Sequence, residues 1–76
     1  MKDLVEKMAT ALVDYPQRVE VTEMQSYEMP VIQLRVAKDD QAKIIGRKGR
    51  MIQAMRTILK AASGNQERNV RLELVE

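Results

Sequence analysis

Apolar residues recur at every third or fourth position near the start of the chain, in the stretch MKDLVEKMATALVD. This spacing places them on one face of a helix, so it predicts an amphipathic helix over residues 2–14. The apolar face consists of Met1, Leu4, Val5, Met8, Ala11 and Leu12. We expect the helix to end at Tyr15-Pro16, because a residue that precedes proline disfavours helical backbone.

Three later segments alternate apolar and polar residues, as strands with one buried face do. Their apolar positions are Val19 and Val21 in the first segment, Ile32, Leu34 and Val36 in the second, and Val70, Leu72 and Leu74 in the third. The sequence does not define where the first strand ends, since the apolar residue Met24 falls where the alternation places a polar residue. The short link SYEMP predicts a turn, so the first two strands are expected to form an antiparallel hairpin.

Two helices are predicted between the second and third strands. Asp39 or Asp40 can cap a short helix by accepting hydrogen bonds from first-turn amides, and Gly46 ends this helix. Helical spacing resumes after Gly49. The apolar face of the longer helix consists of Met51, Ile52, Met55, Ile58, Leu59 and Ala62, and Gly64 is its expected C-cap.

The predicted order is therefore α-β-β-α-α-β, an α+β fold in one domain over residues 1–76. The three helices are expected to cover one face of a three-stranded sheet. The opposite face is then open to solvent or a partner. Its polar residues are Arg18, Glu20, Gln33, Arg35, Arg71 and Glu73.

Composition excludes several classes of function. The chain contains no cysteine and no histidine, so thiolate metal sites, disulfides and the commonest catalytic nucleophile and base are missing. We therefore expect no enzymatic activity, no cofactor and no metal. No segment resembles a signal peptide or approaches the ~20 apolar residues of a membrane span, which predicts a cytoplasmic protein without membrane association.

Positive charge gathers in the middle of the chain. Residues 38–60 contain seven Lys or Arg and two Asp, a net charge of +5, whereas the whole chain carries +2. This segment includes GRKG, in which Gly46 and Gly49 bracket a link between two helices. Glycine permits positive φ and close backbone approach, and the amides at a helix start favour anions, so the link is predicted to bind phosphate. A plain helix-turn-helix corner with solvated cations is the alternative.

The stretch IIGRKGRMI resembles the I-G-x-x-G-x-x-I signature of KH domains, whose G-x-x-G loop clamps the backbone of about four nucleotides. The predicted element order resembles the type II arrangement of that fold. The resemblance covers the whole chain and extends to the small stand-alone bacterial KH RNA-binding proteins. It implies a non-enzymatic protein of the bacterial cytoplasm that holds single-stranded RNA.

The resemblance also assigns roles to individual residues. The loop residues would meet phosphates, the aliphatic residue before the loop would line a groove for unstacked bases, and nearby cations would be outer contacts. The implied RNA-binding residues are Lys43, Ile45, Gly46, Arg47, Lys48, Gly49 and Arg50, and Arg56 and Lys60 would extend the path along the helix. The sequence does not decide whether Ile44 and Ile52 line the groove or belong to the core, although the core is favoured for Ile52. The strand that carries Ile32, Leu34 and Val36 is a candidate neighbour of the groove, although alternation favours the core for these residues.

The predicted function is weak binding of single-stranded RNA with little sequence preference, in a post-transcriptional regulator or RNA chaperone. Single-stranded DNA remains an alternative ligand, because no residue in the pattern would read a 2′-hydroxyl. The alternative class is a protein-interaction module, supported by six methionines and an open sheet face. The resemblance implies a homodimer, or a heterodimer with another KH-containing bacterial protein.

Overall fold

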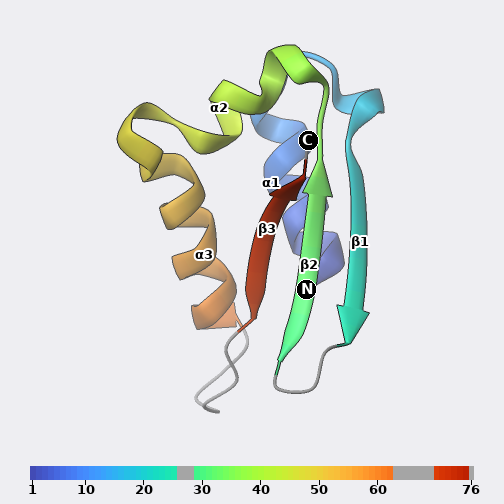
Figure 1. Ribbon diagram of the computed structural model, residues 1–76, viewed down its shortest axis with the longest axis vertical. Helices are drawn as coiled ribbons and strands as arrows, with labels where there is room; N and C mark the ends of the chain where they lie inside the picture. The colour runs from blue at the N-terminus through green and yellow to red at the C-terminus, as the bar shows by residue number, and fades with distance from the viewer. Residues whose placement is uncertain (26–28, 63–69, 76) are drawn as a thin grey trace.

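The computed structural model describes residues 1–25, 29–62 and 70–75 (Figure 1). The helices are α1 (Lys2–Leu12), α2 (Gln41–Ile45) and α3 (Arg50–Ala62), and short 3-10 turns span Pro16–Arg18 (η1), Lys38–Asp40 (η2) and Arg47–Gly49 (η3). The strands are β1 (Glu20–Gln25), β2 (Pro30–Arg35) and β3 (Arg71–Val75). The predicted α-β-β-α-α-β order is confirmed. The first three residues of the expected turn SYEMP (26–30) and the expected cap at Gly64 lie outside the described residues.

The three strands form one mixed sheet in the order β1-β2-β3. β1 pairs with β2 antiparallel, with Val21 opposite Leu34, so the predicted hairpin is confirmed. β3 pairs with β2 in parallel, because two helices carry the chain back to the same end of the sheet. Met24 is opposite Val31 and is 44 % exposed, so it belongs to the outer face of the sheet.

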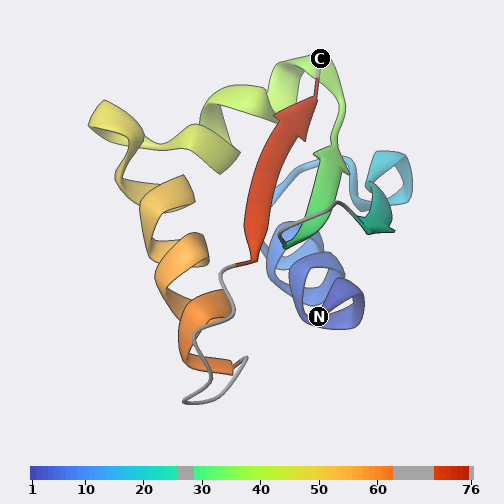
Figure 2. The ribbon, with the colours of Figure 1, turned by 60° about the horizontal axis from the view of Figure 1, so that its bottom comes forward.

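A single hydrophobic core lies between the helices and the inner face of the sheet. Its buried residues are Val5 and Ala9 of α1, Ile32, Leu34 and Val36 of β2 and its end, Ile44 of α2, Ile52, Met55 and Leu59 of α3, and Leu72 of β3. Figure 2 shows α1 beneath the sheet and α3 beside β3. Ile44 and Ile52 are thus core residues, and Ile32, Leu34 and Val36 are buried in the core, as their alternation favoured.

Several sequence predictions about buried and exposed positions were wrong. Ala11, expected on the apolar face of α1, is exposed. Ile58 and Ala62 were expected on the buried face of α3, but Ile58 is 46 % exposed and Ala62 is exposed. The strip of α3 that is buried in the core is narrower than the strip of apolar residues along this helix. Arg18 lies in η1 rather than in a strand, because the chain makes a helical turn after Pro16 before β1 begins. Glu20, Arg35 and Arg71 are exposed on the outer sheet face as expected, and Gln33 and Glu73 are partly exposed.

Asp40 connects two elements instead of capping one. It occupies the N-cap position of α2, but its side chain makes no cap hydrogen bond there, so that prediction was wrong. The carboxylate is fully buried and accepts hydrogen bonds from the amides of Asp14 and Tyr15, each at 3.0 Å. Those two amides belong to the segment that follows α1, beyond its last helical hydrogen bond from Val13 to Ala9. Asp40 therefore ties the end of α1 to the start of α2.

The lengths of the helices bear on the membrane question. α3 is the longest helix described, with 13 residues. Within the parts of the chain that the structure describes, no helix is long and apolar enough to cross a membrane.

Candidate nucleic-acid interface

The link between α2 and α3 turns a corner within four residues, Gly46–Gly49 (Figure 1). Three of them have positive φ: Gly46 at 76°, Lys48 at 57° and Gly49 at 76°. The Gly46 amide donates to the Ala42 carbonyl at 2.8 Å, and the Gly49 amide donates to the Gly46 carbonyl at 3.1 Å. These hydrogen bonds close a compact corner from which α3 begins, so the corner stands at the positive end of that helix.

The two glycines of the corner are required for different reasons. A Cβ at Gly46 would lie 2.6 Å from Met51 Cβ and 2.8 Å from the Met51 backbone nitrogen. Gly46 therefore allows α2 and α3 to approach each other, in addition to its positive φ. A Cβ at Gly49 would meet nothing within 4 Å, so only the φ of Gly49 demands glycine and the space beside it is open. A phosphate chain could approach at Gly49.

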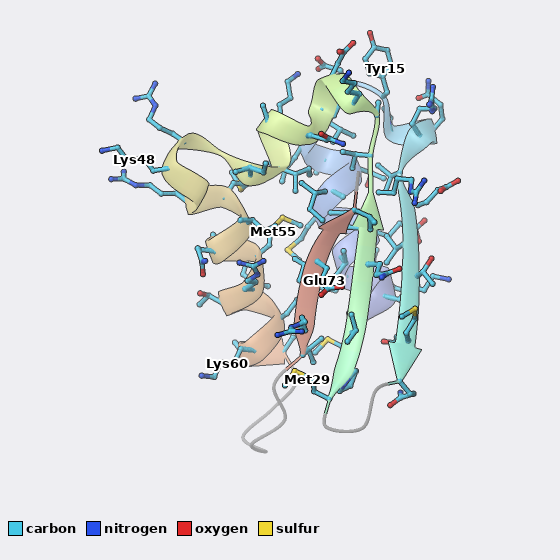
Figure 3. All side chains as sticks on the ribbon, in the orientation of Figure 1. Tyr15, Met29, Lys48, Met55, Lys60 and Glu73 are labelled. Carbon is cyan, nitrogen blue, oxygen red and sulfur yellow. The ribbon has the colours of Figure 1, made fainter. Side chains whose placement is uncertain are left out.

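Three of the predicted cations gather at this corner. Arg47, Lys48 and Arg50 are all exposed. Figure 3 shows Lys48 projecting from the tip of the corner, away from the sheet. Arg47, Lys48 and Arg50 thus form an exposed cationic tip on the protein.

Lys43 lies apart from the tip, in an ion pair with Asp14. Its ammonium donates a hydrogen bond to the Asp14 carboxylate, which raises the pKa of Lys43, and the negative charges of Asp14 and Asp40 add to this increase. The pair joins α2 to the segment that follows α1. Lys43 is therefore directed toward that segment, and a phosphate would have to compete with Asp14 for it.

Ile45 presents an apolar surface beside the corner. It is 41 % exposed, whereas its neighbour Ile44 is fully buried. Successive helical residues point about 100° apart, so Ile44 anchors α2 in the core and thereby turns Ile45 outward. Ile45 and Lys43 lie on opposite sides of Ile44. The structure therefore brings Ile45 near Gly46–Gly49 but directs Lys43 elsewhere.

A hollow of about 470 Å³ lies between α3 and β3, and the sequence analysis did not identify it. Its lining residues are Met29, Arg56, Lys60, Val70, Arg71, Leu72 and Glu73. The guanidinium of Arg56 spans toward β3 and donates to the Leu72 carbonyl from Nε at 3.3 Å and from Nη2 at 3.1 Å. The strand that borders this hollow is thus β3. The available signal was the i, i+4 spacing of Arg56 and Lys60 next to the buried stripe of α3.

Comparisons with known proteins identify the family of the chain. A family model described as KhpA/KhpB, KH domain matches residues 2–74. The chain is 43 % identical over 75 residues to a protein named RNA-binding protein KhpA of Caldanaerobacter subterraneus, covering 99 % of this chain and all of that protein. It is also 43 % identical to the RNA-binding protein KhpA of Halalkalibacterium halodurans, over the full length of both chains.

A solved structure supports the same fold. The chain resembles part of Era, whose crystal structure contains MgGDPNP and nucleotides 1506–1542 of 16S ribosomal RNA, with a TM-score of 0.60 and 25 % identity. The match covers 96 % of this chain but only 28 % of that Era chain. The α+β arrangement with its mixed three-stranded sheet is the KH type II fold, as the sequence predicted. The chain belongs to the KhpA/KhpB family of KH domains.

Proposed function

We propose that this protein binds single-stranded RNA with the Gly46–Gly49 corner and the surface beside it. The single observation that carries the proposal is the exposed cationic tip, built on a corner with an open backbone at Gly49. The names of the relatives and the RNA in the Era crystal structure support it. Phosphates would contact the corner amides, Arg47 and Lys48, with Arg50 as an outer contact and Lys43 available after release from Asp14.

Single strands are the preferred form of the ligand. Ile45 offers an aliphatic surface next to the phosphate site, and such a surface can contact bases only when they are unstacked. Loops and tails provide unstacked bases, whereas A-form helices do not. The proposed cellular role is that of a post-transcriptional regulator or RNA chaperone in the bacterial cytoplasm. The match to a KH-domain family agrees with the expectation that the chain is not an enzyme.

Charge reversal tests the proposal. We expect the double variant Arg47→Asp, Lys48→Asp to fold and to lose at least ten-fold in affinity for a fluorescent single-stranded RNA measured by anisotropy. Each phosphate contact contributes to binding through counterion release, and reversal also adds repulsion. The matched control is Lys2→Asp with Lys7→Asp, two exposed residues of α1 that undergo the same change of charge. Equal losses in both variants, or no loss in the first, would contradict the proposed site.

We also propose that the protein associates with a second KH domain, either its own copy or that of another bacterial KH protein. The supporting observation is an apolar hollow of about 270 Å³ between α1 and α3. It is lined by Met8, Ala11, Leu12, Met51, Ala54, Met55 and Ile58. Ile58 is 46 % exposed there, and methionine side chains adapt to irregular partners.

Sedimentation of the protein tests the association. We expect the parent protein to sediment as a dimer at high concentration, and we expect Ile58→Lys to sediment as a folded monomer. RNA affinity should persist in that variant, because the apolar hollow is lined by residues other than those of the Gly46–Gly49 corner. A parent that stays monomeric at all concentrations, alone or mixed with a second KH protein, would contradict this part of the proposal.

A further inference from the structure

Arg56 has a defined orientation that its exposed position on α3 would not by itself produce. It follows Met55 in sequence, so it lies at the border of the buried stripe of α3. Its Nε and Nη2 atoms both donate to the carbonyl of Leu72. β3 is an edge strand whose other side pairs with β2, so this carbonyl lies on the strand edge that faces α3. The two hydrogen bonds fix the plane of the guanidinium.

One edge of this guanidinium stays available for a ligand. Arginine has five N–H donors, and the bonds to Leu72 use the edge formed by Nε and Nη2. The second edge, formed by Nη1 and Nη2, has no hydrogen-bond partner among the residues that the structure describes. It carries two parallel donors that match two adjacent acceptors, such as the oxygens of a phosphate or O6 and N7 of guanine.

The hollow offers an acceptor as well as donors, and a base with donor groups can use both, whereas a phosphate group only accepts. Arg56, Lys60 and Arg71 line the hollow with donors, and Glu73 lines it with a carboxylate. Glu73 Oε2 lies 3.9 Å from Arg71 Nη1, too far for a hydrogen bond, so the carboxylate retains capacity to accept one. Guanine carries N1–H and N2–H₂ donors on its Watson–Crick edge, which adjoins the Hoogsteen edge formed by O6 and N7. A hollow with an arginine fork and a carboxylate therefore complements both edges of guanine.

The walls of the hollow suit the faces of a base. Met29, Val70 and Leu72 supply apolar surface. Figure 3 labels Met29 and Lys60 at one end of this region, with Glu73 on β3, while Tyr15 lies at the opposite end of the molecule. Arg56 follows Arg50 by six residues, about 9 Å along the helix, which is within the reach of the four nucleotides that a KH groove holds.

We propose that Arg56, oriented by the Leu72 carbonyl, reads guanine at one position of the bound RNA, with Glu73 accepting hydrogen bonds from the N1–H and N2–H₂ groups of the base. The inference rests on the RNA binding proposed above and adds a sequence preference that the Gly46–Gly49 corner does not supply. Adenine presents an amino group where guanine presents O6, so the fork would meet a donor instead of an acceptor.

The test compares oligouridines that carry one central guanosine, adenosine, cytidine or 7-deazaguanosine, which lacks the N7 acceptor. We expect the parent protein to bind the guanosine oligomer about ten-fold more tightly than the adenosine oligomer, and to lose most of this preference with 7-deazaguanosine. Arg56→Lys keeps the positive charge but lacks the two parallel N–H donors of the guanidinium, so this variant should bind all four oligomers about equally. Glu73→Gln should reduce the preference for guanosine as well.

The control variant is Arg35→Lys, the same substitution at an exposed arginine of the outer sheet face. It should keep the guanosine preference. Equal binding of guanosine and adenosine oligomers by the parent, a preference for cytidine, or a guanosine preference that survives in Arg56→Lys would each overturn the inference. If Arg56→Lys does not fold, the comparison with 7-deazaguanosine in the parent still decides it. A parent that binds none of the oligomers would instead refute the proposed RNA binding.

Discussion

Lys48 adopts the left-handed conformation, with φ 57° and ψ 25°. It lies between Gly46 and Gly49, which also have positive φ. For a residue with a Cβ this conformation costs roughly 1–2 kcal/mol. The surrounding corner holds it there through the hydrogen bond from Gly49 to Gly46. Lys48 belongs to the cationic tip that would contact phosphate, so this backbone strain lies at the proposed RNA-binding site.

The two glycines should respond differently to alanine. We expect Gly46→Ala to lower the free energy of unfolding by about 2–5 kcal/mol, because it combines an unfavourable φ with overpacking against the Met51 backbone. Gly49→Ala should cost about 1–2 kcal/mol, since only its φ is unfavourable. Urea denaturation followed by circular dichroism measures both. Equal losses would show that the approach of Gly46 to Met51 contributes nothing to stability.

At the level of elements, a buried carboxylate decides how the first two helices meet. Asp40 accepts hydrogen bonds from the amides of Asp14 and Tyr15, which precede it by 26 and 25 residues. Those two hydrogen bonds fix α2 against the end of α1. The ion pair between Lys43 and Asp14 crosses the same junction at the surface. The junction positions α2, and through α2 it positions the corner and Ile45.

Asp40→Asn should destabilise the protein by about 2–4 kcal/mol. The amide side chain has one acceptor oxygen, so one of the amides of Asp14 and Tyr15 would face an NH₂ group and stay buried without a partner. Thermal or urea unfolding measures the loss. The control is Asp39→Asn, the same change at the exposed neighbouring residue, which should alter stability by less than about 0.5 kcal/mol. Equal stability of the two variants would contradict the role given to Asp40.

At the level of the whole molecule, charge is separated from the apolar surface. One flank of α3 carries Arg56 and Lys60 beside β3, and its other flank carries Met51 and Ile58 beside α1. The proposed RNA surface and the proposed protein surface thus lie on different sides of one helix. A dimer through the apolar flank would leave the cationic flank accessible.

The salt dependence of binding tests how many phosphates the whole surface contacts. Three to five contacts predict a slope of about −2 to −4 for the logarithm of affinity against the logarithm of salt concentration, at about 0.7 per contact in single strands. Anisotropy titrations at several potassium chloride concentrations measure this slope. The double variant at Arg47 and Lys48 should reduce its magnitude by roughly 1.4. A slope near zero would favour the protein-interaction module over RNA binding.

Much of this structure was accessible from the sequence because its signals are local. Alternation predicted the strands, three- and four-residue spacing predicted the helices, and GRKG predicted the corner between α2 and α3. The exposure of Ile58 was missed, because apolar pattern alone does not tell which flank of a wide stripe meets a neighbour. The role of Asp40 was missed because helix capping is a local rule, whereas its partners come from a distant segment.

The sequence by itself determined the element order and the cationic glycine corner, since these follow from backbone preferences and side-chain periodicity over a few residues. The KH type II fold was implied by the resemblance of the IIGRKGRMI stretch and of this element order to that family. Only the tertiary structure decided which strand borders the hollow beside α3 and which atoms meet across it. Arg56 and Leu72 are 16 residues apart, and their hydrogen bonds exist because a parallel sheet brings β3 to the edge beside α3. Gly46 packs against Met51 for a similar reason, as the angle between two helices sets that distance.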